Sequence, residues 1–197
     1  MPRDTRTLTP TDFLPLPEWA KVRKDHRKML SERKKDRRLS VGPYATLYFE
    51  NWDTMWYQVQ EMLWIEKGGD AQIPDELAAY NPMIPNGSEL SATLMFGIAD
   101  EDKRRVVLGQ LGGVEETISI SIGGERIMAV SEADLERTKA DGKTSSVHFL
   151  HFPFTAEQIA RFRDPTSDVM LRIDHPNYGH AALVTGAVRA ELGGDFG

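Results

Sequence analysis

Residues 41–67 constrain the fold most, because this stretch holds three of the chain's four tryptophans together with glutamate and glutamine among large apolar side chains. The pair Gly42-Pro43 interrupts it, and the spacing predicts a helix from residue 51, or from as early as residue 44. At about 100° per residue, one wide apolar face results, formed by Trp52, Met55, Trp56, Val59, Met62 and Leu63. We interpret this segment as a central buried helix against which the rest of the chain packs.

A second helix is predicted over about residues 18–37, and it is strongly basic. Its apolar stripe is narrow, so we expect it to dock by one edge only. The stripe consists of Trp19, Val22, Met29 and Leu30, with His26 on the same side. Between residues 21 and 38, ten Lys or Arg accompany three acidic residues, a charge of +7, which leaves −13 for the rest of a chain with a net charge of −6.

The basic helix can meet its partner within the molecule, across a dimer or on a nucleic acid. A nucleic-acid partner is not expected for residues 21–38, because the run has no interleaved aromatic residues and no groove-reading motif. The central helix carries more apolar surface than one neighbour can cover, so we expect a homodimer that involves it.

From Leu90 the apolar period changes to the two-residue repeat of strands. Strands are predicted at 90–98, 117–122, 125–130, 146–154, 169–174 and 180–191, with Gly123-Gly124 as a hairpin turn. Short helices are expected at 73–80, 100–111 and 155–163, and Ser131–Asp134 resembles the start of another. The predicted fold is α+β, an N-terminal helical hairpin packed on a mainly antiparallel sheet of about five or six strands. We expect a single domain over residues 1–197, with a helical half at 1–80 and a sheet half at 88–192.

Several function classes are excluded or disfavoured by composition. The chain has no cysteine, so it has no disulfide, no thiol nucleophile and no cysteine ligand for an iron–sulfur cluster. Its glycine pairs lack the surroundings of a phosphate-binding loop, and no catalytic triad pattern is present, which favours a non-enzymatic role. No apolar run approaches ~18 residues and the N-terminus has no signal-peptide core, so we expect a cytoplasmic protein without a membrane segment.

Polar residues within the central segment form one candidate site, made of Glu50, Gln58, Glu61 and Glu66. A buried glutamate must be paired, bound to a ligand or protonated. Glu61 or Glu66 could bind a metal or act as an acid or base; alternatively, each pairs with Lys or Arg of the basic helix. Carboxylate-bridged di-iron bundles need a Glu-x-x-His pair on each of two helices, which this sequence lacks, so we favour ion pairing.

His175 and His180 flank one predicted turn and form a second candidate site. With Asp174 they loosely match a two-histidine, one-carboxylate site, so a transition metal such as iron or zinc is a candidate cofactor, with Glu61 and Glu66 as further ligands. Asp174 and His175 are adjacent in a strand, however, so their side chains diverge. The alternative is that these residues serve the turn before Pro176 and a cross-strand contact.

The runs FENWDTMWYQVQEMLWIE, YNPMIP, LSATLMF and DHPNYGH are similar to a family of uncharacterised bacterial proteins of about this length. The resemblance covers most of the chain, from the basic helix to the last strand. It implies a domain of unknown function, often encoded beside rubrerythrin-like and iron–sulfur proteins, without assigned catalytic residues. Our leading hypothesis is therefore an accessory or interaction protein of a redox or oxidative-stress module, with a redox protein as its partner.

Overall fold

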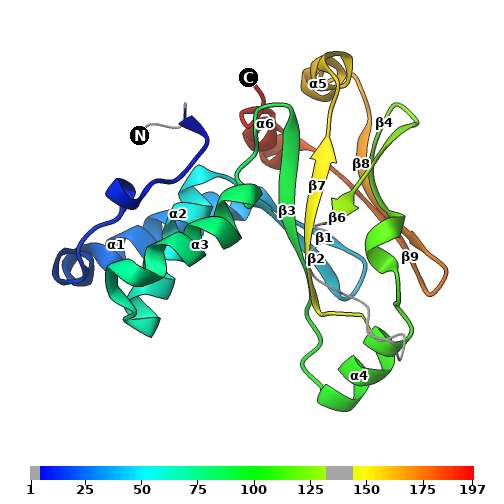
Figure 1. Cartoon of the computed structure of the whole chain (residues 1–197). Helices are drawn as coiled ribbons and strands as arrows, with labels where there is room; N and C mark the ends of the chain where they lie inside the picture. Colours follow the sequence, from blue (N-terminus) through cyan, green and yellow to red (C-terminus); the bar gives the residue numbers. More distant parts are fainter. Residues whose placement is uncertain (1–4, 132–143) are drawn as a thin grey trace.

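The computed structural model describes residues 5–131 and 144–197, and within these ranges the chain forms three layers (Figure 1). Helices α1 (Leu16–Arg33), α2 (Trp52–Glu66) and α3 (Ile73–Tyr80) lie on one side of a five-stranded sheet, and a four-stranded sheet lies on the other. The predicted α+β class is confirmed. The helix expected after Ser131 falls outside the described residues. No described helix combines the length and apolar character needed to cross a membrane.

The first sheet has the strand order β1-β2-β3-β7-β6, and the second has the order β5-β4-β8-β9. Neighbouring strands in both sheets run antiparallel. The first sheet consists of β1 (Arg38–Val41), β2 (Ala45–Glu50), β3 (Glu89–Phe96), β7 (Val147–Pro153) and β6 (Val130–Ser131). The second consists of β5 (Glu125–Met128), β4 (Ile118–Ile122), β8 (Val169–His175) and β9 (Tyr178–Leu183). The remaining helices are α4 (Glu101–Gly109), α5 (Ala156–Arg163) and α6 (Gly186–Gly193).

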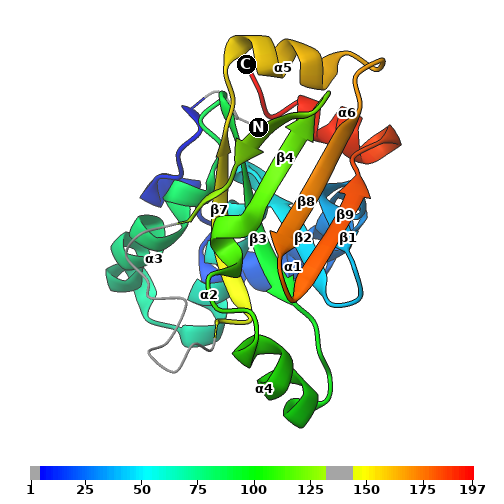
Figure 2. The ribbon, with the colours of Figure 1, turned by 90° about the vertical axis from the view of Figure 1, so that its right-hand side faces the viewer.

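The two sheets face each other and enclose the main core, as Figure 2 shows with β4, β8 and β9 in front of β1, β2 and β3. Apolar residues alternate along each strand, so one row of inward side chains crosses the first sheet through Phe49, Ala92 and Leu150. The isoleucines of β4 supply the opposite wall. Removing these side chains from water is the main stabilising contribution of the sandwich.

A second core lies between α2 and the outer face of the first sheet. It is formed by Met55, Val59 and Leu63 with Leu8, Met83 and Ile84, and Phe149 of β7 packs against it. Thus α2 is the central helix that its sequence predicts. Its first turn is capped by Asn51, whose side chain accepts a hydrogen bond from the Thr54 amide at 3.0 Å.

The segment before α2 corrects one expectation. Residues 45–50 belong to a strand, so the helix does not begin at residue 44, and β1 and β2 form a hairpin across Gly42-Pro43. Helices α1 and α2 pack together, as the predicted helical hairpin requires, but a β-hairpin connects them in sequence instead of a loop. The alternation of buried Ala45, Leu47 and Phe49 explains the strand.

Two further expectations need correction. The strands form two sheets of five and four strands rather than one sheet of five or six. The strand predicted at 180–191 ends at Leu183, and α6 follows it. Gly186 turns the chain at a φ of 55°, and the helix then buries Leu192 in the main core.

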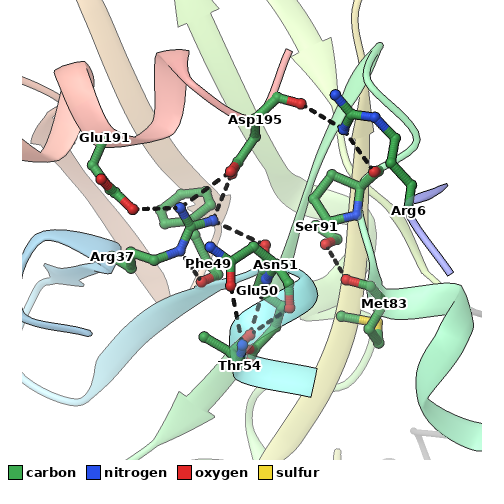
Figure 3. A network of polar contacts seen from close by, with 11 residues as sticks. Arg6, Arg37, Phe49, Glu50, Asn51, Thr54, Met83, Ser91, Glu191 and Asp195 are labelled. Carbon is green, nitrogen blue, oxygen red and sulfur yellow. Dashed lines mark hydrogen bonds and ion pairs between the residues drawn. The ribbon is translucent and has the colours of Figure 1, made fainter. Parts of the chain in front are cut away.

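The chain end is fixed by one buried arginine, Arg37, in the turn that follows α1 (Figure 3). Its side chain is only 2% exposed and donates to the carbonyl oxygens of Phe49 at 3.0 Å and Glu50 at 2.9 Å. It also pairs with Asp195 at 2.5 Å and with Glu191 at 3.1 Å. Burial raises the pKa of Asp195, and the Arg37 guanidinium opposes this rise.

Replacing Arg37 by methionine should lower the free energy of unfolding by about 3–5 kcal/mol, because Asp195 and two carbonyl groups would remain buried without their partner. Urea unfolding at neutral pH measures the change. The matched control is Lys35→Met, which breaks the exposed Lys35–Glu32 pair and should cost about 1 kcal/mol or less. Equal losses for the two variants would contradict a central role for Arg37.

Candidate functional site

A cavity of about 480 Å³ lies between α1, α2 and the N-terminal arm, residues 5–15. We call it the aromatic pocket. Helix α1 contributes His26, Met29, Leu30 and Arg33; helix α2 contributes Trp52, Asp53, Trp56 and Tyr57; the arm contributes Thr11, Asp12 and Leu14. The pocket forms because the narrow apolar edge of α1 does not cover the wide aromatic face of α2.

The tryptophans of α2 form the main wall of the pocket. Trp52 and Trp56 are one turn apart, so they share a face, and their rings lie nearly parallel, at 9°, with centroids 6.3 Å apart. On α1, the His26 ring lies 5.3 Å from the Trp56 ring and 5.3 Å from the Trp19 ring. An imidazole and an indole therefore face each other at one end of the pocket.

The N-terminal arm is held over α2 by polar contacts. The Trp56 indole N–H donates to the carbonyl oxygen of Asp12 at 2.8 Å, and the Trp52 indole N–H donates to that of Thr7 at 3.4 Å. Gln60, which is fully buried, accepts from the Leu14 amide at 2.8 Å and donates to its carbonyl at 3.2 Å. Because these bonds use both indole N–H groups, the tryptophans offer only apolar ring surface to the cavity.

Polar groups lie at both ends of the pocket. At one end, Arg33 forms an ion pair with Asp53, and their side chains are 47% and 15% exposed. At the other end, His26 makes no hydrogen bond within the described part of the chain. The sequence placed His26 on the stripe of α1, but nothing in the sequence pairs Arg33 with Asp53, because that contact depends on the relative placement of two helices.

Glu61, a predicted site residue, lies beside this pocket and forms an ion pair. Its carboxylate accepts two hydrogen bonds from Arg23, both at 2.7 Å, and one from the Trp19 indole at 3.0 Å. The hydrogen-bonded Arg23 guanidinium lowers the pKa of Glu61, against the effect of burial. This geometry agrees with the ion-pairing interpretation, in which the basic helix supplies the partner.

The other predicted polar residues have different partners. Glu66 is exposed and accepts from Gln72 at 2.8 Å. Gln58 donates to the Tyr80 hydroxyl at 3.5 Å. Glu50 is buried on β2, where one carboxylate oxygen accepts from Thr93 at 2.8 Å and the other has no hydrogen-bond partner among the described residues. No shared site among the four follows from these contacts.

His175 and His180, the predicted metal ligands, lie on β8 and β9 of the second sheet. His175 accepts from the Asn177 amide at 3.2 Å and contacts the Gly112 carbonyl at 3.3 Å, so it serves the turn. The His180 ring lies against the Tyr178 ring, with centroids 4.4 Å apart and planes tilted by 40°. Within residues 5–131 and 144–197, no group of three His, Asp or Glu side chains is arranged to hold a metal. The structure therefore does not join His175 and His180 with Glu61 and Glu66, and metal binding stays a prediction.

The DHPNYGH run instead fixes the β1–β2 hairpin to the second sheet. The Tyr178 hydroxyl donates to the Val41 carbonyl at 2.8 Å and accepts from the Tyr44 and Ala45 amides, each at 2.9 Å. Gly42, at a φ of 69°, lies against the His180 ring, and a Cβ there would be 2.5 Å from it. Only glycine fits this position.

Replacing Gly42 by alanine should therefore destabilise the fold in two ways, by positive φ and by overlap with His180. Gly69, at a φ of 67°, has nothing within 4 Å of the same Cβ position, so Gly69→Ala measures the φ cost alone, about 1 kcal/mol. We expect Gly42→Ala to cost about 1–3 kcal/mol more.

Chemical unfolding of four variants tests this: Gly42→Ala, Gly69→Ala, His180→Ala and the double variant of Gly42 and His180. The excess cost at Gly42 should fall in the His180→Ala background, where the Tyr178 hydroxyl, 2.8 Å from the same Cβ position, is the remaining obstacle. An excess that is undiminished there would show that the His180 ring is not an obstacle.

The comparisons with known proteins agree with the described fold. A crystal structure of a protein of unknown function from Burkholderia pseudomallei K96243 matches with a TM-score of 0.89 and 38% sequence identity, covering 97% of this chain and 100% of that chain. No curated protein matches the sequence. The family described as protein of unknown function (DUF3501) matches residues 7–196. The chain therefore belongs to the DUF3501 family.

Proposed function

We propose that this protein is a non-catalytic accessory protein that binds a small, largely aromatic molecule in the aromatic pocket. The observation that carries the proposal is the pocket itself, about 480 Å³ and lined mainly by aromatic and apolar side chains. Small-molecule sites typically measure about 300–1,000 Å³ and combine such walls with a few polar groups. His26 and the Arg33–Asp53 pair supply these groups.

The arrangement of the walls favours a planar ligand. Near-parallel indoles on α2 and the imidazole of His26 on α1 present ring surface to the same space. A ring placed against them gains about 0.5–1.5 kcal/mol per aromatic pair beyond the burial of its surface. The indole N–H groups are already bonded to the arm, so the tryptophans gain most from an apolar face.

A neutral aromatic dye, N-phenylnaphthylamine, tests the proposal, because its fluorescence rises when it leaves water. We expect saturable binding of one dye per chain. Met29→Glu should weaken binding about tenfold, since it places a charge in the pocket wall. Its matched control is Met128→Glu on β5: Met29 and Met128 are 49% and 45% exposed, but only Met29 lines the pocket. Absence of saturable binding, or equal loss in both variants, would refute the proposal.

The finer part of the proposal is service to a redox module, with an acidic redox protein as partner. Family resemblance motivates the redox association, and α1 offers a surface for the partner. Lys21, Lys24 and Lys28 recur at helical spacing, are exposed and form no ion pair within the described residues. Such a face attracts an acidic protein and raises its association rate.

Reversing the three charges, Lys21, Lys24 and Lys28 to Glu, should weaken binding to a rubrerythrin-like protein of the same organism at least about tenfold at low salt. Surface plasmon resonance at low and high salt measures this. The control reverses the same number of exposed charges elsewhere, at Lys67, Lys103 and Arg105. An equal effect of both triple variants, or no salt dependence, would count against α1 as the docking surface.

A further inference from the structure

The aromatic pocket has two chemically different ends, set by how α1 and α2 lie against each other. Arg33 pairs with Asp53 at one end, and His26 faces Trp56 at the other. On α1, His26 and Arg33 are seven residues apart and share a face, which separates them by about 10 Å along the helix axis. A ligand that contacts both ends therefore spans about two helical turns.

Arg33 has binding capacity that the fold does not use. One terminal nitrogen of its guanidinium pairs with Asp53, and its other nitrogens make no hydrogen bond within the described residues. The pair is partly exposed, and such pairs contribute only about 0–1 kcal/mol, so an incoming anion can displace or share it at low cost. The planar guanidinium matches the geometry of carboxylate, sulfonate and phosphate groups.

The acidic groups that face the pocket do not prevent anion binding. Asp12 lines the pocket, but its carboxylate is held by the amide and hydroxyl of Thr9, at 2.7 and 2.8 Å, in the cap of the arm's short helical turn. Asp53 is the competitor for Arg33. The affinity for an anion should therefore depend on the balance between Arg33 and Asp53.

Resting on the proposed function, we propose that the ligand of the aromatic pocket is a planar aromatic acid. Its ring system lies in the cavity against the rings of His26 and Trp56, which contact each other with centroids 5.3 Å apart. Its acidic group binds Arg33 in competition with Asp53. His26, without a hydrogen-bond partner in the described chain, bonds a polar atom at the far end of the ring system. The two rings and the guanidinium thus select for size, planarity and negative charge together.

Two dyes that differ only by an acidic group test the inference. Anilinonaphthalene sulfonate carries a sulfonate, and N-phenylnaphthylamine is the same ring system without it. We expect the wild type to bind the sulfonate more tightly, one per chain, with mutual displacement of the two dyes. Arg33→Gln should weaken sulfonate binding about tenfold and change neutral-dye binding less than about twofold. Asp53→Asn should strengthen sulfonate binding and leave the neutral dye unchanged.

The control variant is Arg105→Gln, which breaks another exposed Arg–Asp pair, with Asp102 on α4, and should alter neither dye. Urea unfolding checks the fold of each variant. Because Arg33 is 47% exposed, we expect Arg33→Gln to remain folded, and it suffices for the test if Asp53→Asn is unstable. If Arg33→Gln leaves the ratio of the two dye affinities unchanged, the inference is overturned. Binding of the neutral dye would still support the proposed function. Failure of both dyes to bind overturns the proposed function itself. Equal displacement by an aliphatic acid such as decanoate would refute the requirement for a planar ring.

Discussion

The fold depends most on the burial of the Arg37 guanidinium, because a buried cation needs acceptors on every side. The end of β2 supplies two carbonyl oxygens, and the C-terminal segment supplies the carboxylates of Asp195 and Glu191. These groups come from distant parts of the sequence, so the arginine joins the turn after α1, the first sheet, α6 and the segment after α6. A second arginine, Arg6, donates to the Asp195 carbonyl at 2.8 Å and ties the arm to the same place.

The aromatic pocket follows from a mismatch between two helices. The apolar face of α2 is wide, and the apolar edge of α1 is narrow, as their sequences predict. Helix α1 cannot cover the whole apolar face of α2, so the arm covers part of the tryptophan surface. The arm is held there by hydrogen bonds from its backbone to the side chains of Trp56 and Gln60. This arrangement also bears on the expected homodimer. Within its own chain, helix α2 packs against the arm, α3 and Phe149 of β7, while the oligomeric state stays a prediction.

The parts of the fold that could be predicted are those encoded by local periodicity. The helices α3, α4 and α5, the strand at 118–122 and the turn at Gly123-Gly124 all follow from spacing and turn chemistry. The division into two sheets could not be derived, because strand order depends on contacts between distant residues. The strand at 45–50 was ambiguous, since its aromatic residues continue directly into a helix that is equally aromatic.

The candidate site was predictable only in part, for the same reason. Glu61 was identified, and ion pairing with the basic helix was the favoured alternative, because a helix rich in Lys and Arg was expected nearby. The metal hypothesis used His175 and His180, and the prediction that these two residues flank one turn was correct. The role of that turn was not visible in the sequence, because Tyr178 and His180 contact Gly42 from the other end of the chain.

The β-hairpin between α1 and α2 has a consequence for ligand recognition. Two helices joined by a short loop can separate by bending that loop, whereas here α1 is followed by β1 and α2 is preceded by β2, and these two strands are hydrogen-bonded in the first sheet. The distance between α1 and α2, which form two walls of the pocket, is therefore set by the register of β1 and β2. It does not change unless the hydrogen bonds between these strands break. A cavity built in this way is preorganised: it loses little conformational entropy when it is filled, and it accepts or rejects a molecule by shape rather than by adapting to it.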